Sequence, residues 1–370
     1  MNITKKFIGL FLVLGLGVQY TAFCQESRDS LDIKIGQMIM IGFSGTAVTN
    51  DDPILDEIVN GTIGGVILFE KNISDSNSYV RLKNLTFTLE RKASIPLFMA
   101  IDQEGGKVNR LKTKYGFPKS VTAEYLGSLD NPDSTRFYAE MTAATLTGLG
   151  FNINFSPVLD LAINPDNPVI VKHGRSYGAD PKVVVRNASI VIRTHRKLGV
   201  ITVGKHFPGH GSSMTDTHLG VADVTNTWQP VELEPYKELV SRDLLDGVMS
   251  AHIVNKKLDP QGLPGTLSGP ILQGLLRDSI HYDGVVFSDD MQMHAITKYY
   301  GLEKAVRLGI NAGLDVVIFS NNIDQSDLRT AGVVHDLIRS MVESGAIKRS
   351  RIDQAYQRIM SLKHTYLYAH

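Results

Sequence analysis

The hydrophobic residues of this 370-residue chain gather in short uninterrupted runs, and each run leads into a polar or glycine-bearing turn. The runs occupy residues 35–43, 63–69, 95–101, 151–158, 200–207, 247–254, 284–290 and 314–320. They have the length of strands, but hydrophobic and polar positions do not alternate within them. Strands of a parallel sheet, which are buried on both faces, have this pattern. The sequence therefore predicts eight buried parallel strands.

Segments with the spacing of amphipathic helices separate these runs. The clearest ones span residues 76–92, 135–149, 182–198, 232–245, 269–279 and 300–312. Most predicted strands are thus followed by a helix, and no glycine fingerprint for a dinucleotide follows the first strand, which disfavours an open doubly wound sheet. We predict an α/β fold, a single closed (β/α)8 barrel of the TIM type. Because no linker or charge block divides residues 25–370, we expect one domain there.

The first 24 residues have the pattern of an export signal. Lys5 and Lys6 precede an apolar run of twelve residues, 7–18, which is short for a membrane-spanning helix but normal for a signal peptide. Small residues at Ala22 and Cys24 favour cleavage before Gln25. We therefore predict a signal peptide over residues 1–24 and an exported protein, periplasmic or secreted. The alternatives are a lipoprotein anchored through Cys24 and a retained membrane anchor.

Composition narrows the classes of partner. Lys plus Arg and Asp plus Glu both number 38, so the formal net charge is zero, and the isoelectric point is near 7.2. A nucleic-acid-binding protein normally carries a basic excess, so we expect no nucleic acid partner. A single cysteine excludes an internal disulfide framework and a multi-cysteine zinc site. We also expect no stable membrane span in the mature chain, whose oligomeric state the sequence leaves open.

Polar residues stand at the carboxyl ends of the predicted strands. They are Asp102, Asp160, Lys205, His206, His252 and Asp289. In a (β/α)8 barrel these ends form one rim, and active sites of this fold lie on that rim. We therefore expect these side chains to gather around one site.

Three histidines in the stretch VGKHFPGHGSSMTDTHLG (203–220) raise the question of a metal site. Pro208 and Gly209 prevent the helix that would place His206 and His210 on one face. No cysteine or carboxylate-rich partner motif accompanies them, so we expect no metal. A purely structural role, in which the histidines only satisfy hydrogen bonds of the loop, stays open at this point.

The same stretch carries Asp216 and His218, two residues apart. In an extended loop this spacing lets a carboxylate orient the imidazole and raise its basicity, which is a common acid–base arrangement. Further along, the stretch YDGVVFSDDMQM (282–293) ends an apolar run on Asp289 and Asp290. Either Asp290 or Ser288 could cap the following helix. A carboxylate at the end of such a strand, facing a histidine acid, could instead attack an anomeric carbon.

These motifs resemble a known family. KHFPGHG with a downstream D-T-H, together with FSDDMQM, IDQEGG and GGVILFEKN, is similar to glycoside hydrolase family 3. The resemblance is narrower still to the β-N-acetylhexosaminidases of the NagZ type, which act on sugars derived from peptidoglycan. It runs from about residue 35 to RIDQAYQRIMSLK (351–363) and so covers nearly the whole mature chain. It implies that residues 25–370 form the catalytic barrel domain of a glycosidase.

The resemblance also implies roles for individual residues. Asp289 would be the nucleophile, His218 the general acid/base, and Asp216 the partner that polarises the imidazole. The implied sugar-binding residues are Asp102, Arg110, Arg175, Lys205 and His206. The implied reaction is retaining removal of terminal N-acetylhexosamine from a GlcNAc-containing glycan or a muropeptide, through a glycosyl–Asp289 intermediate and with no cofactor or metal.

Two departures from the family pattern bear on the substrate. Residues 212–215 read SSMT where relatives often begin Asp-Thr, and the dyad is D-T-H where D-S-H is commoner. Threonine keeps the hydroxyl, but the altered loop leaves the aglycone preference open. The alternatives are a related β-glycosidase, a phosphorylase that uses the same residues, and a sugar-binding barrel without turnover. An export signal is a further departure, because the familiar recycling enzymes are cytoplasmic.

Overall fold

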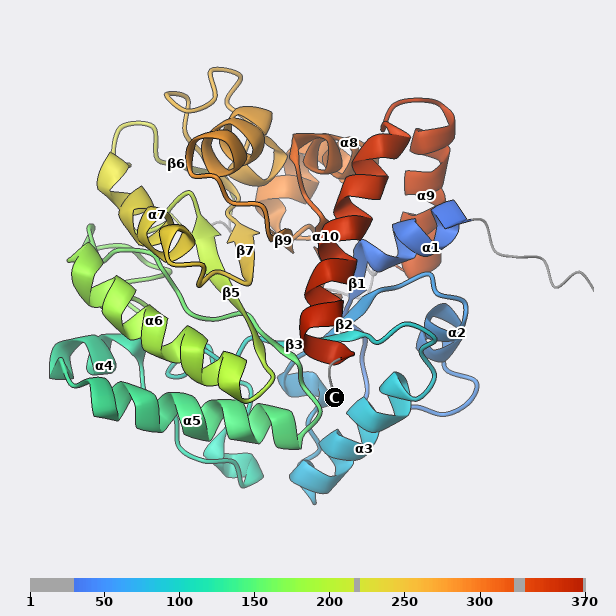
Figure 1. Ribbon diagram of the computed structural model, residues 1–370, viewed down its shortest axis with the longest axis horizontal. Helices are drawn as coiled ribbons and strands as arrows, with labels where there is room; N and C mark the ends of the chain where they lie inside the picture. The colour runs from blue at the N-terminus through green and yellow to red at the C-terminus, as the bar shows by residue number, and fades with distance from the viewer. Residues whose placement is uncertain (1–29, 216–219, 323–329, 369–370) are drawn as a thin grey trace, which may run out of the picture.

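The computed structural model describes residues 30–215, 220–322 and 330–368, and its centre is a closed barrel of parallel strands (Figure 1). The strands are β1 (Ile39–Ile41), β2 (Gly65–Leu68), β3 (Phe98–Ile101), β4 (Ile153–Asn154), β5 (Ile201–Phe207), β7 (Gly247–Ser250), β9 (Val285–Asp290) and β10 (Val316–Phe319). Each pairs in parallel with its neighbours, and β1 pairs with β10 to close the ring. Each strand falls within one of the predicted runs, so the predicted barrel is confirmed.

Helices surround the barrel on its outer face, as Figure 1 shows. They are α2 (Pro53–Val59), α3 (Ser78–Glu90), α5 (Pro132–Gly148), α6 (Pro181–Lys197), α7 (Glu234–Ser241), the π-helix η5 (Pro270–Ser279), α8 (His294–Ala312) and α9 (Ala331–Glu343). Local signals fix where some begin: α6 starts at Pro181 after Asp180, whose side chain accepts a hydrogen bond from the Lys182 N–H at 2.9 Å. The helices predicted from periodicity are all present.

The remaining elements complete the described chain. These are α1 (Ser30–Gln37), α4 (Ala123–Leu129), α10 (Arg349–Leu367), four 3₁₀ turns, η1 (Glu70–Asn72), η2 (Thr113–Tyr115), η3 (Pro230–Leu233) and η4 (Gly265–Leu267), and a two-stranded parallel sheet of β6 (Ala222–Asp223) and β8 (Ile253–Val254). Two predicted boundaries were wrong. The run 35–43 begins within α1, and the run 247–254 is divided between β7 and β8.

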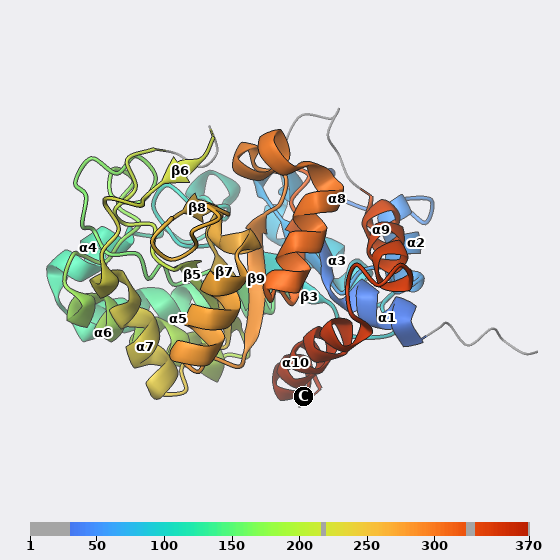
Figure 2. The ribbon, with the colours of Figure 1, turned by 90° about the horizontal axis from the view of Figure 1, so that it is seen from above.

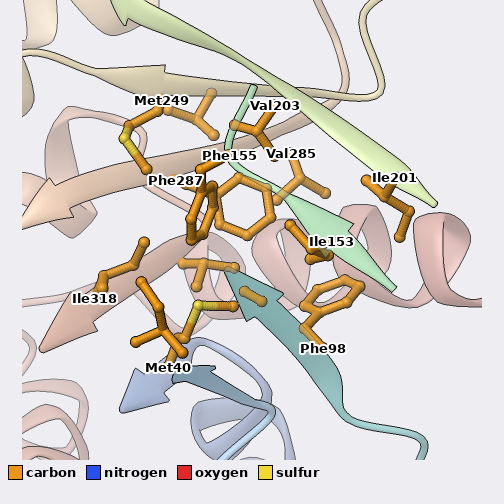
Figure 3. Close-up of a cluster of buried hydrophobic side chains, with 14 of the residues drawn as sticks. Met40, Phe98, Ile153, Phe155, Ile201, Val203, Met249, Val285, Phe287 and Ile318 are labelled. Carbon is orange, nitrogen blue, oxygen red and sulfur yellow. The ribbon is translucent and has the colours of Figure 1, made fainter. Parts of the chain in front are cut away.

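A layer of large side chains fills the inside of the barrel (Figure 3). Phe287 is central: its ring centroid lies 5.7 Å from that of Phe155, edge to face, and 6.1 Å from that of Phe98. All three are fully buried. Edge-to-face contacts of this kind add to the burial energy of the rings. The barrel interior is therefore a packed core, and a ligand can bind only at its ends.

Helix α10 covers the end at which the strands begin. The buried ammonium of Lys363 donates to Gln37 Oε1 at 2.6 Å, to the Pro96 carbonyl at 2.7 Å and to the Gly64 carbonyl at 2.9 Å. These acceptors lie just before β1, β3 and β2. Figure 2 shows α10 on the opposite side of the barrel from β6 and β8. No helix within residues 30–215, 220–322 and 330–368 is long and apolar enough to cross a membrane.

Candidate active site

A cavity of about 370 Å³ opens at the carboxyl ends of the strands. Six of the eight residues predicted for the site line it: Asp102, Arg110, Arg175, Lys205, His206 and Asp289. They come from the ends of β3, β5 and β9 and from the loops that follow β3 and β4. The structure thus brings these six side chains together at one rim. Asp216 and His218 lie outside the described residues.

Lys205 is the centre of a buried network of charges in this cavity. Its Nζ lies 2.8 Å from Asp102 Oδ1 and 2.6 Å from Glu104 Oε1. Arg175 binds Glu104 through two parallel hydrogen bonds of 2.8 Å, from Nε and Nη2. Arg110 Nη2 stands 3.5 Å from Asp102 Oδ2. Paired bonds of this kind fix both the position and the plane of the groups that make them.

Burial and charge oppose each other in this network. Burial would raise the pKa of Glu104, but the adjacent cations Arg175 and Lys205 outweigh it and hold the pKa well below its usual range. Burial would likewise lower the pKa of Lys205, but Asp102 and Glu104 raise it above its ordinary value. Glu104, Arg175 and Lys205 are therefore held in their charged forms, with fixed positions before any substrate arrives.

Sequence reasoning missed Glu104 as a site residue. It stands two positions after Asp102 in IDQEGG, and its side chain is only 6% exposed. A second carboxylate could have been expected, because a lysine and an arginine buried at one rim need more than one carboxylate to balance their charges. Glu104 supplies that second carboxylate.

His206 is oriented by a buried carboxylate behind it. Its Nδ1 lies 2.6 Å from Asp160 Oδ2, and Asp160 Oδ1 accepts the backbone N–H groups of His206 and His210 at 3.2 and 2.8 Å. Burial works against the charge on Asp160, but His206 and these bonds keep its pKa below the ordinary value. On the other side of the ring, Arg175 Nη2 donates to His206 Nε2 at 3.3 Å. The ring proton is therefore assigned to Nδ1, and Nε2 acts as an acceptor in the cavity.

Asp289 and Asp290 end the same strand but have different surroundings. Both line the cavity, and Asp289 Oδ1 accepts the N–H of Asp290 at 2.7 Å. Asp290 Oδ1 accepts the N–H groups of Gln292 and Ser320, both at 3.1 Å, and its Oδ2 accepts the Ser320 hydroxyl. Burial raises the pKa of Asp290. Asp290 thus connects the end of β9 to the end of β10.

The possibility that Asp290 or Ser288 caps the following helix was wrong. Helix α8 begins after Met293 without a side-chain cap. Ser288 Oγ instead accepts the N–H of Ile318 in β10, at 2.9 Å. The backbone N–H groups of Ile318 and Ser320, in β10 and just after it, lie beside Ser288 and Asp290. Both polar side chains therefore bond to this segment rather than to helix α8.

His252, also expected at the rim, supports the site from outside the cavity. It is fully buried, with Nδ1 at 2.8 Å from Thr266 Oγ1 and Nε2 at 2.9 Å from the Asp290 carbonyl. It therefore holds the end of β9 rather than facing a ligand.

A packed (β/α)8 barrel with carboxylates, an imidazole and fixed cations around one rim cavity is an arrangement that glycoside hydrolases use. Comparison with known proteins identifies the family. Residues 30–362 match the glycosyl hydrolase family 3 N-terminal domain, so the chain belongs to this family.

Proteins similar in sequence and in structure are found in several bacteria. A "Beta-hexosaminidase" of Nitrosomonas eutropha is 32% identical over 298 residues, which cover 78% of this chain and 82% of that protein. Among solved structures, a family 3 β-N-acetylglucosaminidase from Paenibacillus superimposes with a TM-score of 0.83 at 33% identity, over 91% of this chain and 62% of that one. A β-N-acetylhexosaminidase from Beutenbergia cavernae gives 0.81 at 27% identity, over 90% and 98% of the two chains.

Proposed function

We propose that the protein is a retaining exo-β-N-acetylglucosaminidase. It removes terminal non-reducing N-acetylhexosamine residues from peptidoglycan fragments or other GlcNAc-containing glycans. The observation that carries the proposal is the convergence of Asp289 and the charge network around Lys205 on one cavity of about 370 Å³. That volume is at the small end of ligand sites, which suits one terminal sugar. The names of the similar proteins support the same substrate class.

In this proposal the charge network holds the sugar and leaves its anomeric carbon beside Asp289. The carboxylate of Asp102 accepts sugar hydroxyls, while Arg110, Lys205 and Arg175 donate to hydroxyl oxygens. Because Glu104 and Asp160 already fix Arg175, Lys205 and His206, little ordering is needed when the substrate binds. Binding energy can then be used at the transition state.

The reaction proceeds in two steps. Asp289 attacks C1 and forms a glycosyl ester, while His218 gives a proton to the departing glycosidic oxygen. A water molecule then attacks C1, His218 takes a proton from it, and the bond from C1 to Asp289 breaks. Asp216 orients the imidazole and balances its charge when it is protonated. Two displacements at C1 retain the β configuration.

A chromogenic substrate tests the activity. We expect p-nitrophenyl N-acetyl-β-glucosaminide to be hydrolysed in phosphate-free buffer and the corresponding β-glucoside to be turned over far more slowly. Added phosphate should change neither the rate nor the product. Formation of a sugar 1-phosphate would make the protein a phosphorylase. Binding of N-acetylglucosamine without any turnover by folded protein would support a sugar-binding barrel instead.

We also propose that the protein is exported, with a mature N-terminus at Gln25. The support is the charge of Lys5 and Lys6 followed by the apolar run 7–18. Intact-mass measurement on protein purified from the native host should give the mass of residues 25–370. A mass that includes Met1 would contradict export with cleavage, and a mass for acylated Cys24 would establish a lipoprotein.

A further inference from the structure

A further buried carboxylate, Glu232, lies behind the cavity wall. It belongs to η3, and its side chain is almost fully buried. Its Oε2 accepts the N–H of Gly211 at 3.0 Å, and its Oε1 accepts the N–H of Gln229 at 3.2 Å. One carboxylate thus joins the beginning of α7 to the turn that follows β5.

That turn, residues 208–212, approaches its neighbours too closely for side chains at two positions. A Cβ on Gly209, whose φ is +116°, would stand 2.6 Å from the Cβ of Glu232. A Cβ on Gly211 would stand 1.8 Å from the carbonyl oxygen of Leu161. Two glycines in KHFPGHG are therefore required by the contact with Glu232 on one side and the loop after β4 on the other.

Between these glycines lies His210, which lines the cavity. Its backbone is bonded on both sides: the N–H donates to Asp160 Oδ1 at 2.8 Å, and the carbonyl accepts from Asn167 Nδ2 at 2.8 Å. The bond from Gly211 to Glu232 follows directly. Asp160 also holds His206, so one set of buried carboxylates positions both histidines of this wall.

We infer that Glu232 is a positioning residue for the reaction, which in its ionised form holds the turn at His210 in place against the cavity. A carboxylate accepts hydrogen bonds on both oxygens. A carboxylic acid has one hydroxyl oxygen, a poorer acceptor, so protonation weakens one of the two bonds to Gly211 and Gln229. The inference rests on the proposed function, because it is tested by measuring turnover of the N-acetylglucosaminide.

Of Glu232, Asp160, His210 and Tyr236, Glu232 is the group whose pKa lies near neutral pH. Burial raises the pKa of Glu232 to about 7; contacts with Ser212 and Gln229 oppose this, and the charge of Asp160 adds to it. Asp160 has a lowered pKa and stays ionised. Burial lowers the pKa of His210 to about 4, and it raises that of Tyr236, on α7, well above 10, so both stay neutral. His206 stands next to this set, with its ring centroid 5.8 Å from that of His210.

The raised pKa of Glu232 sets the direction in which kcat should change with pH. Below pH 7 most molecules carry neutral Glu232 and a weakened bond, and above pH 7 the ionised form makes both bonds. Glu232→Gln imitates the neutral form at every pH, because the amide nitrogen cannot accept an N–H. The kcat of this variant should therefore resemble that of the wild type near pH 5.5. It should be lower by roughly threefold to tenfold at pH 8, the scale of one ordinary hydrogen bond.

The experiment compares kcat and KM of the wild type, Glu232→Gln and Glu234→Gln from pH 5 to 9. Glu234 is the matched control, because it lies two residues away and is half exposed. The ratio of kcat between Glu232→Gln and the wild type should fall as pH rises through 7, and that of the control should stay level. A ratio that is constant with pH would overturn the inference, whereas an inactive wild type would refute the proposed function.

A measurement on the wild type covers the case in which Glu232→Gln does not fold. Infrared difference spectra between pH 6 and pH 8 should show the loss of a protonated carboxyl band, and the Asp290→Asn variant should show the same loss. Glu232→Asp, which keeps a titrating group with shorter reach, should lose activity and retain a pH-dependent ratio. If no carboxyl group titrates in this range, Glu232 does not act as inferred.

Discussion

Replacing Asp289 with asparagine is expected to reduce kcat for the N-acetylglucosaminide by roughly 10⁴-fold or more, the order of loss when a nucleophile is removed. The amide is a poor nucleophile and cannot form the glycosyl ester. Its shape is unchanged, and Oδ1 can keep its bond to the Asp290 N–H. Substrate binding should therefore survive while turnover does not. Steady-state kinetics with a binding measurement on the same variant separate the two.

Asp290→Asn is the matched control for this prediction. Its Oδ1 can keep the bonds from Gln292 and Ser320, and its Nδ2 can donate to the Ser320 hydroxyl in place of the present bond. We expect this variant to retain much of the activity. Full activity of Asp289→Asn, or equal losses in the two variants, would contradict the assignment of the nucleophile.

Loss of His218 is expected to depend on the leaving group. General acid/base help is worth roughly 10²–10⁴-fold, and a disaccharide needs a proton on its departing oxygen. A nitrophenolate departs without one, so His218→Ala should impair glycosylation by that substrate far less. Hydrolysis of the glycosyl ester would then limit the rate, and added azide should restore part of the turnover. Rates on both substrates, with and without azide, test this expectation.

Asp216→Ala should fail in the same direction as His218→Ala, but more mildly, because it removes only the orienting and charge-balancing partner. The double variant should be little worse than His218→Ala alone, since residues that act as a unit are non-additive. Losses that multiply across the cycle would mean that Asp216 acts elsewhere, for example as an anchor of its loop. The assignment of Asp216 and His218 as a catalytic dyad would then be wrong.

The barrel could be predicted because strands buried on both faces leave a continuous apolar signature. Each of the eight strands lies inside a predicted run, and the rim position of Asp102, Lys205 and Asp289 followed from their place at the ends of those runs. The ends of the individual strands were harder to predict from the sequence. The run at 247–254 contains an apolar stretch long enough for one strand, but β7 ends at Ser250 and β8 is paired with β6 instead.

The partners of the site residues could not be read from the chain in the same way. Glu104 and Asp160 act through contacts with residues 46 to 101 positions away, and no local spacing indicates such contacts. Glu232 is harder still, because its sequence neighbourhood is that of an ordinary amphipathic helix start. Its relation to KHFPGHG becomes visible only when the close approach to Gly209 and Gly211 is known. Positioning residues of this kind require the folded structure.

The central claim is a covalent glycosyl intermediate on Asp289, and trapping that intermediate tests it most directly. A fluorinated N-acetylglucosamine analogue, whose ester hydrolyses slowly, should inactivate the protein and add its mass to one peptide. This peptide should contain residues 284–293, and fragmentation should place the label on Asp289. A label on another residue, or continued turnover of the analogue with inversion at C1 and no labelled protein, would contradict it.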